Sequence, residues 1–397
     1  MEFFCESFCN SKQKIAKRLP PNPKELPFFP PGFGITIASA KGKTETQQER
    51  EEITMKLKRT MSMVMAGTMA AGMLAGCGSN GSSGGGSAAS DGSAQKEMTF
   101  VIANRDEFMS KVEQAMTAEG EKLGYKIVTQ DAQLDTAKQM QYVETCANAG
   151  QEAVAVLLVD TEAAQSIMDS AGEMKVAFVN RQPADLHVLD AENACYVGSD
   201  EFTSGYFQGE YLAQYFKDKG KTDIKYLMLQ GTLGQVATTQ RSEGALQALK
   251  DNGINATEGS APLAADFDRP TAQEMIQPLL TTTEYDCIIA NNDAMALGAV
   301  EACREAGVEI DFPIVGIDCT ADGAQALIDG NLAMTVFQDP VGQGRGAILA
   351  CMNMINGDPI NTGMEKYALD DSGESYSDSI CWVPFEPVTV DNVADYM

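Results

Sequence analysis

The chain has 397 residues, with 56 acidic and 29 basic side chains and a net charge of −27. So acidic a chain repels phosphate backbones, which argues against nucleic-acid binding, and its charge favours solubility. The chain contains a single histidine, His187. This weighs against a metal site built on several histidines and against a hydrolase with a histidine-based triad.

Residues 1–54 show no periodicity typical of a helix or a strand. We interpret them as a translated leader, because Arg50-Glu51-Glu52 can be encoded by a purine run that resembles a ribosome-binding site. Met55 is then the predicted start. The alternative is a genuine N-terminal extension, which would bury the export signal that follows it and hinder export.

Residues 55–77 have the features of a secretory signal peptide: a short basic stretch, an apolar run and small residues before a cleavage site. The apolar run is about half as long as a membrane-spanning helix. A short buried helix is the alternative, but the Gly/Ser-rich tract after it offers nothing to pack. The run Leu74-Ala75-Gly76-Cys77 resembles a bacterial lipobox, which implies that Cys77 is lipidated and anchors the chain. Residues 78–97 then form a flexible linker.

From residue 98 onward, apolar runs alternate with helical patterns. The strands predicted first are 98–103, 125–129, 153–159 and 175–179, with helices near 108–123, 136–149 and 161–172 between them. A second unit has predicted strands at 225–229, 254–260, 286–290 and 313–317, with helices at 238–251, 271–283 and 293–306. Continuous apolar runs are typical of parallel strands buried on both faces. The pattern predicts an α/β chain with two doubly wound parallel-sheet lobes.

Ligands of such sheets bind at the carboxyl ends of the strands. Polar and aromatic side chains stand at or near those positions: Asp106, Phe108, Asn180, Arg181, Arg241, Phe267, Asn292, Asp318 and Gln338. Taken singly, such an Asn or Asp is usually a helix cap, such a Phe a core residue and such an Arg an ion pair. The set lacks a nucleophile–base pair and a phosphate loop. Its amides, carboxylates, guanidinium groups and rings suit the hydroxyls and the apolar face of a sugar.

Several stretches carry a family resemblance, among them "DEFMSKVEQAM", "YVGSDEFTSGYFQGEYLA", "ADFDRPTAQ", "IIANNDAMALGAVEA" and "IVGIDCTADG". Over 98–397 the chain resembles periplasmic sugar-binding proteins of the ribose/galactose type, the receptors of ABC importers. The resemblance implies a type I periplasmic-binding-protein fold, with a three-strand hinge that crosses near 199–200, 338–339 and 381–383. The lobes would comprise 98–199 plus 340–382, and 200–338 plus 383–397.

The resemblance also implies ligand contacts. Phe108 and Phe267 would sandwich the sugar ring, while Asp106, Asn180, Arg241, Asn292 and Asp318 would meet its hydroxyls. We expect Arg241 and Phe267 to face the cleft rather than the lobe cores, so that replacing either spares folding. Gln338 and Arg181 are ribose-like, whereas Asp106 and the Asn-Asn-Asp run resemble galactose-type members. Leu157 stands where both types usually have asparagine, and Gln235 and Ala237 replace a galactose-type histidine and aspartate.

We therefore expect an aldohexose ligand, galactose or glucose first, with a ribose-type pentose as the alternative. The galactose-type calcium loop is replaced by "FKDKGKTDIKY", so no metal and no cofactor is predicted. The expected protein is a monomeric, non-enzymatic lipoprotein on the outer face of the bacterial cytoplasmic membrane. It would deliver its sugar to the membrane subunits of an ABC importer.

Three other functions use the same fold or the same residues. A sugar sensor that presents its ligand to a membrane signalling partner is compatible with the receptor. A regulator of the lactose-repressor type shares the core fold, but it needs a helix-turn-helix where this chain has a signal peptide and linker. A glycosidase could use Asp106 and Asp318 as acid and base, although two ligand-binding carboxylates are the favoured interpretation.

Overall fold

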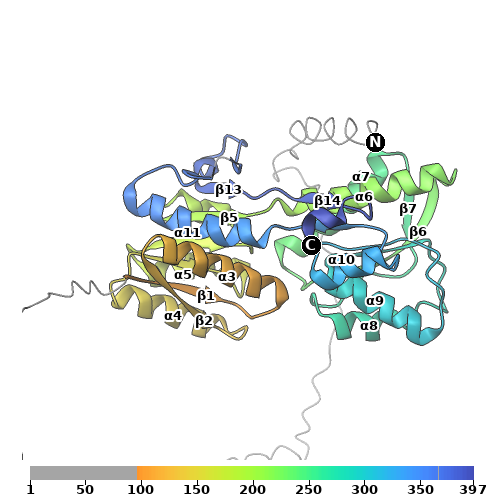
Figure 1. The fold of residues 1–397 in the computed structure, drawn as a ribbon, viewed down its shortest axis with the longest axis horizontal. Coiled ribbons are helices and arrows are strands. Elements are labelled where there is room, and N and C mark those ends of the chain that lie inside the picture. The colour runs from red at the N-terminus through yellow and green to blue at the C-terminus, as the bar shows by residue number, and fades with distance from the viewer. Residues whose placement is uncertain (1–95, 365) are drawn as a thin grey trace, which may run out of the picture. The chain divides into compact units, whose positions relative to one another are not determined.

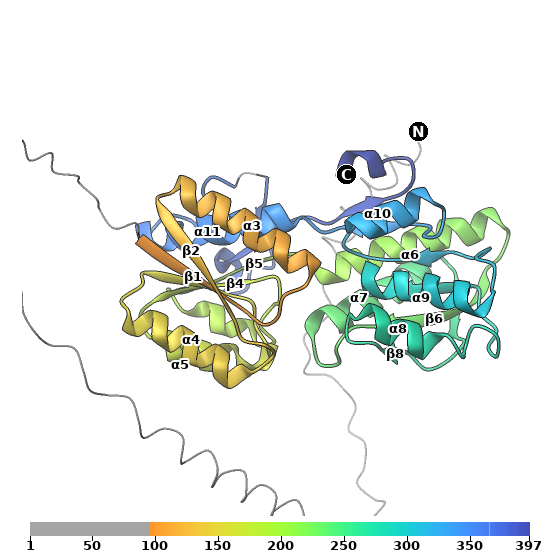
Figure 2. The same ribbon diagram turned by 60° about the horizontal axis from the view of Figure 1, so that its bottom comes forward.

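The computed structural model describes residues 96–364 and 366–397. The predicted leader 1–54, the signal segment 55–77 with Cys77, and the linker as far as residue 95 lie outside the described residues. The described part contains nine α-helices, and none of them is long and apolar enough to cross a membrane. Figures 1 and 2 show two α/β bodies, each built on its own sheet.

The first sheet has seven strands in the order β12-β13-β5-β4-β3-β1-β2. Their bounds are β1 Lys96–Ile102, β2 Tyr125–Asp131, β3 Ala153–Val156, β4 Lys175–Val179, β5 Ala194–Gly198, β12 Ala368–Leu369 and β13 Ile380–Trp382. All neighbours are parallel except β12 and β13. The central strands β3 and β5 are buried along their whole length, as expected of a sheet covered on both faces.

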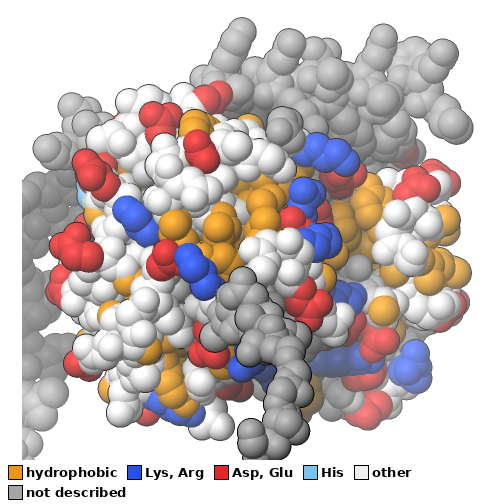
Figure 3. Space-filling view, turned by 60° about the vertical axis from the view of Figure 1, so that its left-hand side comes forward, with side chains coloured by type: hydrophobic (Ala, Val, Ile, Leu, Met, Phe, Trp, Pro, Cys, Tyr) orange, Lys and Arg blue, Asp and Glu red, His pale blue; other side chains and the backbone are white. Residues whose placement is uncertain are grey.

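Helices cover both faces of this sheet, and together they make the first lobe. On one face, α3 (Glu107–Lys122) and α11 (Pro340–Asn356) share a hydrophobic cluster with Phe100 and Ile102 of β1. On the other face, α4 (Thr136–Asn148) and α5 (Ala164–Ala171) pack with Val101. The alternation along β1 is the period of two that sends successive side chains to opposite faces. Figure 3 shows acidic, basic and hydrophobic side chains intermixed on the side of the molecule where this lobe lies.

The second sheet has the order β10-β9-β6-β7, and β8 also pairs with β6. Its strands are β6 Asp223–Gln230, β7 Asn255–Glu258, β8 Leu263–Ala264, β9 Cys287–Ala290 and β10 Ile314–Val315. Three helices, α8 Arg269–Ile276, α9 Asp293–Ala306 and α10 Ala321–Ile328, contribute to its hydrophobic cluster. Two more, α6 Glu201–Asp218 and α7 Val236–Asp251, pack tightly against each other. These elements make the second lobe.

The chain passes between the two sheets three times. It leaves the first sheet after β5 and enters α6, returns from β11 (Thr335–Phe337) into α11, and leaves again after β13 for β14 (Glu386–Val388). Strands β11 and β14 pair with each other antiparallel beside these passages. The predicted fold class, two doubly wound parallel-sheet lobes joined by three passages, is confirmed.

Some predicted elements are shorter in the structure. The helix predicted over 271–283 ends at Ile276, because Pro278 has no backbone N–H and clashes with the preceding turn. The strand predicted over 153–159 ends at Val156. Beyond it the side chain of Gln139 bonds the carbonyl of Leu157 at 2.7 Å and the amide of Val159 at 3.0 Å, which replaces the strand ladder. The strands predicted at 254–260 and 313–317 shorten to Asn255–Glu258 and Ile314–Val315, and β1 begins two residues before the predicted start at 98.

The close approach of α6 and α7 depends on glycine, and this gives a test of the packing. A Cβ on Gly205 would lie 1.9 Å from the carbonyl oxygen of Arg241. We expect Gly205→Ala to lower the free energy of unfolding by about 3 kcal/mol, measured by urea titration. Gly220→Ala is the control: this residue has φ +68° and open space around it, so only backbone strain of about 1 kcal/mol is expected. Equal losses in the two variants would contradict the packing described here.

Candidate functional site

Seven of the nine predicted site residues stand at the carboxyl ends of strands or in the turns that follow them, whereas Phe108 lies in the first turn of α3 and Arg241 lies within α7. Asn180 follows β4 directly, Asp106 precedes α3 after β1, and Asp318 lies just beyond β10. Asp106 belongs to the first lobe and Asp318 to the second. The charge of Asp106 contributes to raising the pKa of Asp318, after the larger effect of burial.

Left-handed backbone conformations gather at these turns. Among non-glycine residues, Asn180 has φ 64°, Phe267 has φ 60° and Asp318 has φ 115°. Such conformations cost on the order of 1–3 kcal/mol each and persist only where the surroundings enforce them, which is most often at functional sites. Three of the nine predicted site residues therefore occupy strained backbone positions.

In the first lobe, hydrogen bonds fix the polar groups. Arg181 donates from Nη1 to the carbonyl of Leu158 at 2.9 Å and from Nη2 to Oδ1 of Asn104 at 3.0 Å. Burial lowers the pKa of Arg181, and the charge of Asp106 opposes this shift. Asn180 donates to Oε1 of Gln343 at 3.0 Å, and its carbonyl accepts from the hydroxyl of Tyr196 at 2.7 Å.

Asp106 has two roles in the geometry. Its Oδ1 accepts from the amide of Met109 at 2.7 Å, so it caps α3. Its side chain reaches solvent, yet the protein atoms around it desolvate the carboxylate and raise its pKa, against the opposing effects of the Met109 amide and Arg181. The carboxylate thus keeps accepting capacity beyond the helix cap.

The two predicted stacking rings are each anchored in a lobe. Phe108 packs partly buried against the cluster of the first lobe, and Phe267 does the same in the second. The ring of Phe267 lies over Gly231, where a Cβ would approach its Cζ to 1.9 Å. Gly231 thus provides the room that the ring needs, a role the sequence alone did not reveal. Leu157, by contrast, contributes its side chain to the core of the first lobe.

Arg241 lies deeper than expected, with 5% of its surface exposed. Its Nε donates to Oε2 of Glu201 at 2.6 Å, its Nη1 donates to the carbonyl of Asn291 at 2.7 Å, and Nη1 lies 3.9 Å from Oδ1 of Asp318. Burial alone would lower the pKa of Arg241, but the two carboxylates outweigh it and raise the pKa. The expectation that Arg241 can be replaced without harm to folding is therefore wrong, because its removal leaves Glu201 buried without its partner.

Asp293, the first residue of α9, stabilises the turn that contains Asp318 through hydrogen bonds. Asp293 accepts from the hydroxyl of Thr335 at 2.7 Å and from the amide of Thr320 at 2.9 Å. Burial raises the pKa of Asp293 to about 7, against these two donors. Burial also raises the pKa of Asp318 well above its usual range, opposed by Arg241. Asn292 caps α9 by accepting from the amide of Met295 at 3.0 Å.

Gln338 lies at the second passage between the sheets and is 2% exposed. Within the described part of the chain, its Nε2 has no hydrogen-bond partner. Leaving a buried donor unpaired costs about 1–3 kcal/mol, so this amide is poised to donate to a bound group.

Sequence reasoning missed Glu201, and it assigned no role in the site to Gly231, Asn104 or Asp293, although Asp293 belongs to the Asn-Asn-Asp run. Glu201 and Asp293 each occupy the first turn of a helix, where an acidic residue is ordinary. Their partners are far away in the sequence, so no local signal distinguishes them.

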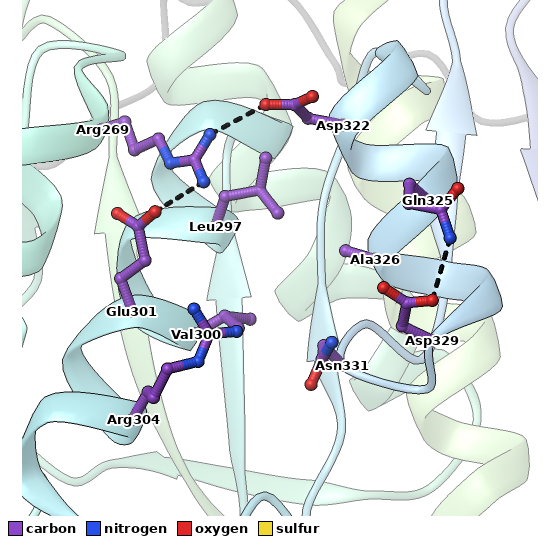
Figure 4. A pocket seen from close by; sticks show the side chains of 10 residues that line it. All are labelled: Arg269, Leu297, Val300, Glu301, Arg304, Asp322, Gln325, Ala326, Asp329 and Asn331. Atoms are coloured by element: carbon purple, nitrogen blue, oxygen red, sulfur yellow. Dashed lines mark hydrogen bonds and ion pairs between the residues drawn. The ribbon is translucent and has the colours of Figure 1, made fainter.

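Two surface pockets lie apart from these strand ends. One, of about 180 Å³, is lined by α9 and α10 and contains Arg269, which bonds Glu301 at 2.6 Å and Asp322 at 3.0 Å (Figure 4). The other, of about 520 Å³, lies in the first lobe and is lined by residues 147–148, 151–152, 171, 173–175 and 355. Neither contains a predicted site residue. Over residues 96–364 and 366–397, no group of three or more His, Cys, Asp or Glu side chains is arranged to hold a metal ion.

The chain is similar to known proteins over most of its length. The family model described as the periplasmic binding protein domain matches residues 99–359. A putative rhizopine-binding protein of Rhizobium meliloti is 30% identical over 277 residues, which cover 69% of this chain and 82% of that protein. The D-galactose/methyl-galactoside binding periplasmic protein of Haemophilus influenzae is 29% identical over 325 residues, which cover 79% and 95% of the two chains. Among solved structures, an ABC transporter solute binding protein from Bacillus halodurans with bound myo-inositol is 30% identical, with a TM-score of 0.65, and the match covers 76% of this chain and 97% of that one.

The buried pair predicts a stability loss when Arg241 is removed. We expect Arg241→Met to lower the free energy of unfolding by about 3–5 kcal/mol in urea titration, because Glu201 then stays buried and unpaired. The double variant Glu201→Leu/Arg241→Met should recover a substantial part of this loss. Arg345→Met is the control, because Arg345 is half exposed and its loss leaves Glu119 paired with Lys122, so it should cost about 1 kcal/mol or less. A loss for Arg241→Met no larger than that of the control would contradict the structure.

Proposed function

This chain belongs to the periplasmic binding protein family, and we propose that it is the sugar-binding receptor of an ABC importer. The observation that carries the proposal is the set of polar groups at the strand ends of both lobes: Asp106 of the first lobe, Asp318 of the second, and Gln338, whose buried Nε2 has no partner among the described residues and whose backbone amide bonds the carbonyl of Asp318 at 3.4 Å. A single polyol placed between these carboxylates can donate hydroxyl hydrogens to both. Arg181, Arg241 and Gln338 supply donors around the same place, and Phe108 and Phe267 supply ring faces for stacking.

For the ligand we propose an aldohexose, galactose or glucose first. Asp106 and the Asn-Asn-Asp run at 291–293 favour it, and so does the similarity to a galactose-binding protein that the match covers almost entirely. Ribose is the alternative, because Arg181 and Gln338 are ribose-like and because a ribose import binding protein of Salmonella typhimurium is 29% identical over 279 residues. The Bacillus halodurans structure with bound myo-inositol adds a second alternative, a cyclic polyol without a ring oxygen.

The proposed mechanism is closure of the lobes on the ligand. Asp106, Phe108, Asn180 and Arg181 stand on the first lobe, and Arg241, Phe267, Asn292 and Asp318 on the second. A ligand that needs both sets is bound fully only when the lobes are together, so it shifts the population toward the closed form. The three passages between the sheets are where the backbone would bend.

The proposal includes no enzymatic step. Asp106 and Asp318 act as hydrogen-bond acceptors, and the relatives named above are binding proteins. The protein would be a monomer, exported and held by lipid on Cys77 at the outer face of the cytoplasmic membrane, where it meets the importer's membrane subunits. Delivery of the closed form to a membrane signalling partner is compatible with the same site.

The ligand class can be tested with the protein's own fluorescence. Trp382 is the single tryptophan, and it lies at the end of β13, where the third passage starts. It packs edge-on to Tyr196 at 5.8 Å, and the hydroxyl of Tyr196 donates to the carbonyl of Asn180. We expect galactose or glucose to change the emission of Trp382 and to raise the melting temperature. At 100 times Kd the ligand should stabilise the fold by about 2.7 kcal/mol.

Ribose and myo-inositol serve as the comparison ligands in the same titrations. A larger stabilisation by either of them would replace the aldohexose assignment. If no neutral sugar or cyclic polyol produced a shift, the sugar-receptor proposal would fail.

The anchor is tested separately. Cells that express Cys77→Ser should release the protein from the membrane fraction, because the thiol that carries the lipid is gone. The mature parent should begin at Cys77. Retention of Cys77→Ser on the membrane, or a mature N-terminus upstream of residue 77, would contradict the lipoprotein assignment.

A further inference from the structure

Arg241 is a proposed ligand-binding residue, and Glu201 forms an ion pair with Arg241 without contacting the ligand itself. We propose that Glu201 is a positioning residue for binding: it fixes the guanidinium of Arg241 and takes up its charge, which leaves Asp318 free to accept hydrogen bonds from the sugar. This inference rests on the proposed function. It deepens that function by assigning a role to a residue that does not itself meet the ligand.

The carboxylate of Glu201 is positioned to form an ion pair with Arg241. It is the first residue of α6, directly after the passage from β5, and 2% of its surface is exposed. Its Oε2 receives the Nε–H of Arg241 at 2.6 Å, a distance typical of a strong charge-assisted hydrogen bond. The carbonyl of Asn291 holds Nη1 at 2.7 Å. Two edges of the guanidinium are therefore fixed, Nε by Glu201 and Nη1 by the carbonyl of Asn291.

The geometry also decides which carboxylate neutralises Arg241. The contact to Glu201 is 2.6 Å, whereas Nη1 lies 3.9 Å from Asp318, beyond hydrogen-bond distance. Arg241 therefore pairs with Glu201 rather than with Asp318. Were Glu201 neutral, the guanidinium would lack this partner, and Asp318 would become its nearest counter-ion.

The charges that face Asp318 come from four elements. Arg241 of α7 lowers its pKa, whereas Asp293 of α9, Asp106 before α3 and Glu201 of α6 raise it, in addition to the larger effect of burial. The ionised carboxylate of Asp318 is the form that accepts hydroxyl hydrogens on both oxygens. Sugar affinity should therefore fall as the pH drops through the pKa of Asp318 in the folded protein. Because the charge of Glu201 raises that pKa, removing the charge should move the fall in affinity to lower pH.

The test is Glu201→Gln, which keeps the shape and an oxygen acceptor but removes the charge. We would measure Kd by calorimetry for the sugar that stabilises the parent most, from about pH 4.5 to about pH 8. The variant should bind about 10- to 100-fold more weakly at neutral pH, because Arg241 is drawn toward Asp318 and competes with the ligand. Its acid midpoint should lie below that of the parent. In Asp318→Asn the part of the pH dependence that belongs to Asp318 should disappear, whereas a step from Asp106 should remain.

Glu119→Gln is the matched control. Glu119 is also buried and ion-paired, with Lys122 at 2.9 Å and Arg345 at 3.5 Å, but it lies on α3 near the C-terminal end of that helix. Its replacement should leave both Kd and the acid midpoint unchanged. A purely structural role for Glu201 would lower stability without moving the midpoint.

If Glu201→Gln does not unfold cooperatively, its binding data cannot be interpreted, and Glu201→Asp becomes the test variant. It keeps the charge but is too short to keep the 2.6 Å contact, so it should bind more weakly with the midpoint of the parent. Two results would overturn the inference and leave the receptor function standing. One is a Glu201→Asp variant that binds the sugar as tightly as the parent. The other is a Glu201→Gln variant whose affinity and acid midpoint both equal those of the parent. A parent that binds no sugar would overturn both.

Discussion

The ion pair between Arg241 and Glu201 is the interaction on which the rest of the site depends. Both side chains are almost fully buried, and Asp318, the other carboxylate near the guanidinium, lies 3.9 Å away and leaves the pair to Glu201. A buried ion pair adds little net stability, because desolvation cancels most of the attraction. The pair does fix the relative position of two helices, because it joins the start of α6 to the middle of α7. Glycines at 205, 209 and 244 let these helices approach closely enough for the contact.

The turns with positive φ angles serve the same purpose as the ion pair, because they also hold polar groups of the site in fixed positions. Asp318 adopts φ 115°, and Asp293 holds the turn around it through Thr335 and the amide of Thr320. Gly316 and Gly323 leave room for the Asp293 carboxylate, since a Cβ on either would come within about 2.2 Å of it. The fold thus holds a carboxylate with a raised pKa at the position where a ligand hydroxyl would meet it. Preorganisation of this kind reduces the ordering that binding has to supply.

The fold class could be predicted from the sequence because the parallel strands are buried on both faces and appear as apolar runs. Helix α9 was predicted with its observed bounds, since Asn292 and Gly307 cap it locally. Helix α8 was predicted too long, because the apolar period continues past Pro278 although the backbone cannot. Most candidate site residues followed from their places after strands, and the family resemblance implied their roles, including that of Arg241 within α7. Glu201 could not be found in this way, because its importance lies in a contact 40 residues away.

The central claim is that one ligand is held by residues of both lobes. A crystal structure of the protein with the sugar that stabilises it most tests this directly. The account predicts a single sugar whose hydroxyls contact the carboxylates of both Asp106 and Asp318, with Nη2 of Arg241 donating to it and Glu201 still on Nε. A sugar that contacts residues of only one lobe, or that lies away from the carboxyl ends of the strands, would contradict the account.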